Sequence, residues 1–156
     1  ERTASTITLA IGGGVGFPTS ESTRNDWIQS HAVGVGRSRA AQLLTRYGTK
    51  ATEFISAITS GHDVALRTTL LYTTAELDYL VRTESVVHLE DVLLRRTDLA
   101  FLGAVTGPMI EELADVVGAS LGWTNEQRVA EIVAARETLT TMHGQVFTDQ
   151  PAAVKG

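Results

Sequence analysis

The chain of 156 residues contains no cysteine. This absence excludes a disulfide framework and any metal site built on thiolates. Long apolar runs are also missing, because no stretch approaches the roughly 20 residues that a membrane-spanning helix needs. The first residues carry no signal-peptide pattern. Hydrophobic residues make up 43% and charged residues 20% of the chain, which is typical of a globular protein and not of a disordered one.

Basic residues are also fewer than acidic ones, 13 against 18. The formal net charge is -5 at pH 7, which disfavours a surface for phosphates or anionic lipid. A chain of this length can bury one hydrophobic core and need not contain a second. Because it begins at Glu1 and not at methionine, we expect it to be a piece of a longer protein.

The longest helical stretch without glycine or proline is residues 74–102, which predict two helices. The first begins at Thr74, a good N-cap residue. The apolar residues that follow have the spacing of one buried helical face: Leu77, Leu80 and Val81. Glu84 lies one turn further along that face.

The second helix is predicted to begin near His88. The helix dipole favours the two acidic residues of its first turn, Glu90 and Asp91. Arg96 falls among the apolar residues of its buried face, which are Leu89, Val92, Leu93, Leu99 and Ala100. An isolated charge on such a face is costly to desolvate, so we predict that Glu84 pairs with Arg96 or Arg95. If that pair is buried, removing Arg96 should cost about 3 kcal/mol.

These two segments carry a family resemblance. The runs A-E-L-D-Y-L-V-R-T-E and L-E-D-V-L-L-R-R-T-D-L-A resemble the C-terminal helical cap domain of FAD-dependent glycerol-3-phosphate dehydrogenases and the related alpha-glycerophosphate oxidases. In that family a D-V-L-x-R-R-T segment follows a helix that ends in an acidic residue. The matching residues here are Asp91, Val92, Leu93, Arg95, Arg96 and Thr97. Looser matches are Tyr47-Gly48 and Leu121-Gly122-Trp123. His88 stands where the family usually has Thr, so the cap of the second helix is expected to differ.

The resemblance implies a parent enzyme that oxidises glycerol 3-phosphate to dihydroxyacetone phosphate, reduces its FAD and passes electrons to quinone. The flavin and substrate residues of that family lie upstream, so none is assigned to this chain. The implied partners are the upstream FAD and substrate domains and a possible homo-oligomer, without nucleic acid. The parent is expected in the cytoplasm, peripheral on the inner face of the cell membrane. Within this chain, the resemblance and the apolar setting make four residues structural or interdomain groups: Glu84, Asp91, Arg95 and Arg96.

The whole pattern predicts an all-α fold of about six or seven short helices around one core. Residues 1–20 are predicted as a linker or disordered start, 21–144 as the cap domain and 145–156 as a tail. Two helices are expected over 20–31 and 37–47, and Thr49 should cap a third that ends at Gly61. The apolar face of this third helix is Ala51, Phe54, Ile55 and Ile58.

Two further helices are expected near the end of the chain. Gly107-Pro108 begins one whose buried face is Met109, Leu113, Val116 and Val117, with Glu111, Glu112 and Asp115 turned outward. Thr124 and Gln127 form a capping box for the last helix, which should run to about Met142. Its predicted buried residues are Val129, Ile132, Val133 and Leu139.

Residues 12–18, G-G-G-V-G-F-P, follow an alternating run at 7–11 that predicts a short strand. A strand followed by glycines is the context of a dinucleotide-binding loop. The spacing fails, because counting from Gly12 or Gly14 leaves no glycine at the third required position. Pro18 also interrupts the helix that should begin there, so we expect a flexible interdomain loop.

Residues 34–49 favour a second interpretation. The run G-V-G-R-S-R-A-A-Q-L-L-T-R-Y-G-T resembles a helix-hairpin-helix element, in which a G-x-G turn lets backbone amides approach a phosphate. The side chains of Arg37 and Arg39 are placed to assist in binding that phosphate. A nucleic-acid-binding module is therefore one alternative function, and a free-standing helical protein-interaction domain is another.

No set of residues predicts chemistry within this chain. His62-Asp63 is typical of a solvated turn. The four histidines lack the i, i+4 spacing of a helical metal site. The acidic pair Glu111 and Glu112 is interpreted as a solvated face. We therefore expect no catalytic, cofactor-binding or metal-binding residue in this fragment.

Overall fold

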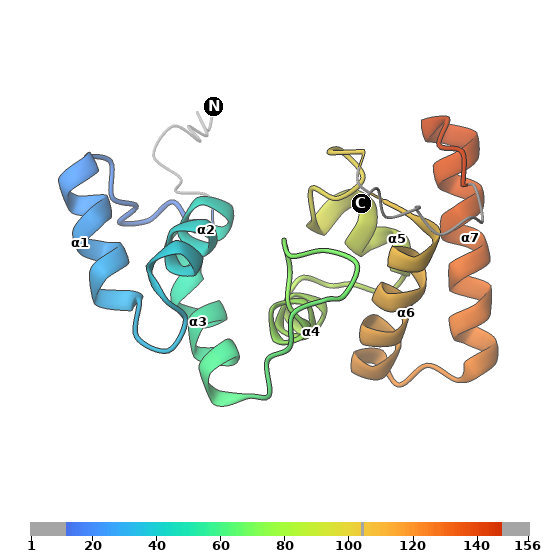
Figure 1. Ribbon diagram of the computed structural model, residues 1–156, viewed down its shortest axis with the longest axis horizontal. Coiled ribbons are helices and arrows are strands. Elements are labelled where there is room, and N and C mark those ends of the chain that lie inside the picture. The colour runs from blue at the N-terminus through green and yellow to red at the C-terminus, as the bar shows by residue number, and fades with distance from the viewer. Residues whose placement is uncertain (1–11, 104, 148–156) are drawn as a thin grey trace, which may run out of the picture. The chain divides into compact units, whose positions relative to one another are not determined.

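The computed structural model describes residues 12–103 and 105–147, and over them it is all-helical, as predicted (Figure 1). The chain divides into two compact units, residues 1–63 and 64–156. The sequence pattern, which predicts one core, does not indicate this division. The strand predicted near Ile7 lies outside the described residues.

From residue 12 onward, unit 1 contains three helices, α1 (Glu21–His31), α2 (Arg37–Tyr47) and α3 (Ala51–Ser60), with a 3-10 turn, η1 (Gly48–Lys50), before α3. The helix bounds agree with the prediction. The predicted inner face of α3 is buried, and α2 buries Ala40, Leu43 and Leu44 beside it. Helix α2 packs against both α1 and α3, so this core is built from faces that the helical period alone identifies.

The glycine-rich segment at the start of unit 1 packs closely against η1. Thr49 does not cap α3 as predicted, because its hydroxyl donates to the carbonyls of Gly13 (3.2 Å) and Val15 (2.9 Å). Its backbone N–H also donates to Gly13, at 2.9 Å. A Cβ atom on Gly13 or Gly48 would overlap the backbone of the other segment. The glycines are therefore needed for a close backbone contact, and the segment is not the free loop predicted from the sequence.

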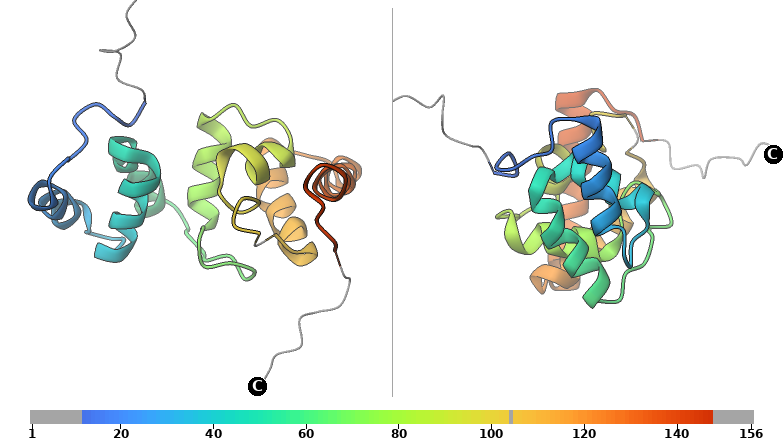
Figure 2. Two further views of the ribbon diagram at one scale, coloured as in Figure 1. Left: turned by 90° about the horizontal axis from the view of Figure 1, so that it is seen from above. Right: turned by 90° about the vertical axis from the view of Figure 1, so that its left-hand side faces the viewer.

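The described part of unit 2 contains four helices, α4 (Thr74–Thr83), α5 (Leu89–Asp91), α6 (Gly107–Leu121) and α7 (Asn125–His143), and α5 continues into a π-type turn, η2 (Val92–Arg96). Helix α6 packs on α4 and α7, and α7 packs on α5. Helices α6 and α7 run antiparallel and are joined by a short turn (Figure 1), and they lie side by side in the view from above (Figure 2). None of the helices in the described part of the chain is long and apolar enough to cross a membrane.

Two predicted details of unit 2 are wrong. Thr73, not Thr74, is the N-cap of α4, because the Thr74 hydroxyl accepts a hydrogen bond from the backbone N–H of Val64 (3.0 Å). Helix α7 is also rotated from its predicted orientation, although Leu139 is buried as predicted. Val129 and Val133 are 50% and 57% exposed. The fully buried residues of α7 are Ala135 and Leu139.

The end of the described chain is fixed against unit 2, although the sequence predicts a tail from Gln145. The Gln145 side chain donates to the carbonyl of Val105, and its backbone N–H donates to Leu139 at 3.1 Å. The Arg136 guanidinium lies 6.0 Å from the centre of the Phe147 ring. These contacts hold the residues that follow α7 against the helix they leave.

Candidate functional site

The predicted ion pair between Glu84 and Arg96 is present, but it is weak. Arg96 Nη1 lies 3.9 Å from Glu84 Oε2, and the two side chains are 38% and 33% exposed. Glu84 is the C-cap of α4 and Arg96 ends η2. Both side chains therefore leave the ends of helices, where they reach solvent, and the burial assumed from their place on apolar faces does not occur.

Asp91 fixes the start of α5 from within the same turn. Its Oδ2 accepts hydrogen bonds from the backbone N–H groups of Val87 (3.1 Å) and His88 (3.0 Å), while Oδ1 lies 3.0 Å from Arg95 Nη1. Burial opposes ionisation, but the backbone hydrogen bonds and the nearby Arg95 charge leave the pKa of Asp91 below its ordinary value. Asp91 and Arg95 thus order the helix start.

The expected change of cap at His88 involves a distant residue, Glu131 on α7. Glu131 Oε2 accepts from the backbone N–H of Leu89 (2.9 Å), and Oε1 lies 2.8 Å from His88 Nδ1. The hydrogen bond and charge of Glu131 raise the pKa of His88. In the opposite direction, Thr138 of α7 donates to Glu90 at 2.6 Å. Helix α7 therefore supplies the first-turn cap that a local Thr would otherwise provide.

Glu112 is the most consequential residue that sequence reasoning missed. It is only 9% exposed, so the prediction of a solvated face is wrong for this side chain. Its carboxylate accepts from the backbone N–H groups of Arg67 and Thr68 (both 2.8 Å), the Thr68 hydroxyl (2.6 Å) and Arg67 Nε (3.2 Å). Burial alone would raise the pKa of Glu112, but these hydrogen bonds outweigh it and lower the pKa to about 2. A local signal existed, because Glu112 lies three residues after Met109 and so shares the buried face of α6.

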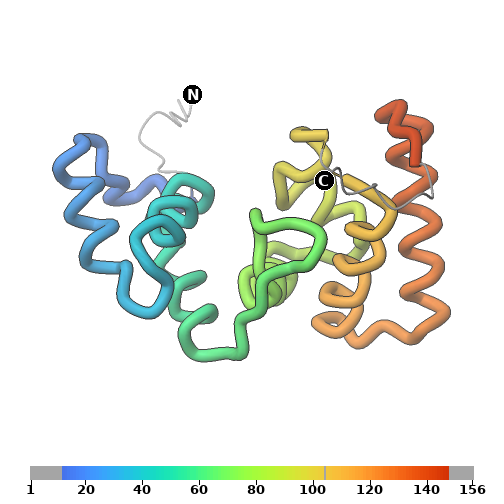
Figure 3. Tube along the Cα trace, in the orientation of Figure 1, coloured from blue at the N-terminus to red at the C-terminus, as the bar shows by residue number. Residues whose placement is uncertain are grey.

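Glu112 fastens the loop of residues 64–73, which leads into α4 (Figure 3). An isolated antiparallel bridge between Ala65 and Thr73 closes the two ends of this loop. Tyr72 is buried, and its hydroxyl donates to Asp98 Oδ1 at 2.7 Å. The backbone N–H of Asp98 donates in turn to the Tyr72 hydroxyl oxygen at 3.3 Å. The loop is thus held at its base, by α6 and by the segment that follows η2.

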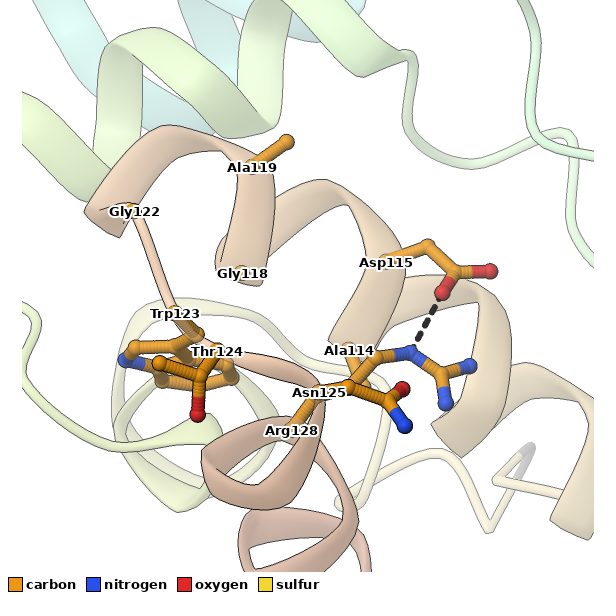
Figure 4. Close-up of a pocket in the computed structure, with 9 residues that line it drawn as sticks. All are labelled: Ala114, Asp115, Gly118, Ala119, Gly122, Trp123, Thr124, Asn125 and Arg128. Atoms are coloured by element: carbon orange, nitrogen blue, oxygen red, sulfur yellow. Dashed lines mark hydrogen bonds and ion pairs between the residues drawn. The ribbon is translucent and has the colours of Figure 1, made fainter.

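A shallow pocket of about 390 Å³ opens at the turn between α6 and α7 (Figure 4). Trp123 forms part of its wall and packs against Gly118, where a Cβ atom would press on the indole ring. The charged groups in the pocket are Asp115 and Arg128, which bind each other with Nε 2.5 Å from Oδ1. Since these two charges neutralise one another, the pocket offers an aromatic wall and little net charge.

A model of one protein family, the C-terminal domain of alpha-glycerophosphate oxidase, matches residues 4–128 of this chain. The chain belongs to that family. No curated protein matches it. The family consists of accessory domains of FAD-dependent oxidases, so the resemblance seen in the sequence is confirmed at that level. The match covers Glu84, Asp91, Arg95, Arg96 and Glu112, whereas Glu131 lies beyond it.

The segment that resembles a helix-hairpin-helix element, residues 34–49, forms the end of the turn between α1 and α2, helix α2 and the start of η1. Gly34 has φ 84°, and a Cβ atom there would lie 2.6 Å from the Thr59 side chain of α3. Gly36 caps α2 without a side chain, and Arg37 is exposed. The close approach to α3 explains Gly34 through packing alone. His62 and Asp63 are also exposed, at the end of unit 1.

Proposed function

We propose that this chain is the C-terminal accessory domain of a flavoenzyme that oxidises sn-glycerol 3-phosphate to dihydroxyacetone phosphate. FAD in the upstream part of the parent accepts the electrons, and quinone takes them from the reduced flavin. The domain packs against the flavin and substrate domains and contributes to the oligomer. The parent works as a peripheral protein on the inner face of the cell membrane.

The observation that carries this proposal is the family match over residues 4–128. The geometry of unit 2 is consistent with an accessory role, because its strongest polar contacts hold one segment to another. Glu112 binds the backbone of loop 64–73, and Glu131 binds the start of α5. Carboxylates that accept hydrogen bonds from backbone and side-chain donors in this way hold structure in place and are poor general bases.

The full-length parent provides the decisive test. Under anaerobic conditions, glycerol 3-phosphate should bleach the absorbance of its bound flavin, and a soluble quinone should then restore that absorbance. The control is the 156-residue chain mixed with free FAD, which should show no substrate-dependent bleaching. A parent whose flavin is not reduced by glycerol 3-phosphate would contradict the proposed substrate.

The choice of acceptor and the oligomeric role are tested separately. Reoxidation by quinone should be much faster than reoxidation by dissolved oxygen, and the reverse order would identify an oxidase. Light scattering on the parent with and without residues 12–147 should show a smaller assembly when the domain is removed. An unchanged mass would remove oligomerisation from the proposal.

A further inference from the structure

We propose that two loops of unit 2 form a docking surface for the upstream flavin- and substrate-binding part of the parent chain. The loops are residues 64–73 and 97–103, and their apolar anchors are Leu70 and Phe101. This inference rests on the proposed function, because it names the face through which the accessory domain meets the enzyme.

Both anchors are large apolar side chains held in solvent. Leu70 is 85% exposed and Phe101 is 93% exposed, and Leu102 beside it is half-exposed. Each loop is also free of charge around its anchor, since residues 68–75 and 99–110 contain no charged side chain. Exposed apolar side chains without neighbouring charges are the usual composition of the centre of an interface.

The loops are ordered before any partner binds. Glu112 holds the backbone of Arg67 and Thr68 just before Leu70. The hydrogen bond from Tyr72 to Asp98 then joins the first loop to the start of the second. A contact surface that is already rigid loses little conformational entropy on binding, so apolar anchors on it contribute more of their burial to affinity.

The charge of unit 2 favours the upstream part of the parent over a second copy as the occupant. Residues 64–156 contain thirteen acidic and seven basic side chains, so two copies of this unit repel each other. The upstream part belongs to the same polypeptide in this family, and a covalent link gives it a high effective concentration at the surface. Protruding side chains such as Leu70 and Phe101 also require a hollow partner, which two identical loops do not offer each other.

Hydroxyl-radical footprinting with mass spectrometry tests the surface directly. Side-chain oxidation is measured in the 156-residue chain and in the full-length parent. Leu70 and Phe101 should be oxidised readily in the chain and severalfold less in the parent. Val133, an exposed apolar residue on the outer face of α7, is the matched control and should be oxidised equally in both.

A pair of double variants adds a functional measurement. In the full-length parent, Leu70→Ser with Phe101→Ser should lower the temperature at which flavin fluorescence appears on heating. Val129→Ser with Val133→Ser should leave that temperature unchanged. In the 156-residue chain both double variants should melt like the wild type, because all four side chains are largely exposed.

The outcomes separate this inference from the proposed function. Equal oxidation of Leu70 and Phe101 in the chain and the parent would overturn the inference. Protection of Val133 in their place would also overturn it and would make α7 the interface. Protection in the isolated chain that grows with protein concentration would identify a second copy as the occupant and would overturn it too. Failure of the proposed function is measured independently. In that case glycerol 3-phosphate does not bleach the flavin absorbance of the parent.

Discussion

Units 1 and 2 are both helical and both have apolar cores, but unit 2 has carboxylate contacts between distant segments in addition. In unit 1 the helices meet through apolar faces, and one backbone contact between Gly13 and Thr49 closes the structure. In unit 2 carboxylates of Glu112 and Glu131 reach across to the backbone of distant segments. Their charges differ as well, with six basic and five acidic residues in 1–63 against seven and thirteen in 64–156. Acidic residues in unit 2 are thus part of the framework as well as of the surface.

The two tryptophans of the chain make this comparison measurable. Trp27 lies in α1 of unit 1, and Trp123 lies between α6 and α7 of unit 2. Trp27→Phe and Trp123→Phe each leave a single reporter, so fluorescence during urea unfolding follows one unit at a time. The single-tryptophan chains serve as backgrounds for the variants below.

The largest effect is expected in unit 1, from Gly48→Ala. Gly48 has φ 61° and ψ -141°, a conformation nearly restricted to glycine, and a Cβ atom would overlap the Gly13 carbonyl. We expect unit 1 to lose about 4 kcal/mol of unfolding free energy, measured through Trp27. Gly36→Ala is the control, because Gly36 also has positive φ but nothing lies within 4 Å of its Cβ position. It should cost about 2 kcal/mol. Equal losses would mean that the contact with Gly13 contributes nothing.

The corresponding variant of unit 2 is Glu112→Ala. It leaves the N–H groups of Arg67 and Thr68 without their acceptor, and we expect a loss of about 3 kcal/mol, measured through Trp123. Glu111→Ala is a neighbouring control whose exposed carboxylate pairs with Arg136 at the surface, and it should cost less than about 0.5 kcal/mol. If Glu112→Ala and Glu111→Ala lower the unfolding free energy equally, polar contacts do not distinguish unit 2 from unit 1.

The stability of unit 2 should also depend on acid in a predictable direction. Because folding lowers the pKa of Glu112 from 4.5 to about 2, its contribution is complete above about pH 4.5 and is lost as the pH falls toward 2. The full contribution is about 3 kcal/mol. Urea unfolding at pH 7, 5 and 3.5 should show that the difference in unfolding free energy between wild type and Glu112→Gln becomes smaller as the pH falls. A difference that stays constant with pH would contradict the lowered pKa of Glu112.

A smaller effect is expected at the interface of α5 and α7. Glu131→Ala removes the cap on Leu89, at a cost of about 1 to 2 kcal/mol. Glu137→Ala changes an exposed carboxylate on the same helix and should be nearly neutral.

Because Glu131 raises the pKa of His88, the contribution of His88 to stability is present below about pH 6.5 and disappears as the pH rises through the raised value. A wild type whose advantage over His88→Ala grows with pH would contradict this.

The smallest effect is expected from Arg96→Ala. The sequence places Arg96 on an apolar face and predicts a loss of about 3 kcal/mol for a buried pair. With Arg96 and Glu84 each about one-third exposed and 3.9 Å apart, the loss should be below about 1 kcal/mol. Arg82→Ala, which breaks an exposed pair with Asp78, should cost about the same. A loss of about 3 kcal/mol of unfolding free energy, measured through Trp123 fluorescence, would mean that the pair is buried in solution.

The sequence by itself determined the helices and most of their inner faces. Period 3.6, the helix start at Gly107-Pro108 and the cap at Thr124 are local properties, and each is found where the pattern puts it. The family was also readable from a run of residues in α4, α5 and η2. These features need only neighbours along the chain.

Only the tertiary structure decided which polar groups are buried and which way α7 faces. Glu112 is ionised and buried because loop 64–73 brings two backbone N–H groups to it from more than 40 positions away. Helix α7 turns Val129 and Val133 outward, while the face that packs on α5 and α6 carries Glu131 to the open end of α5. Hydrophobic periodicity counts apolar residues, but it takes no account of a helix end whose unsatisfied N–H groups need an acceptor from another segment. That choice depends on atoms that only folding brings together.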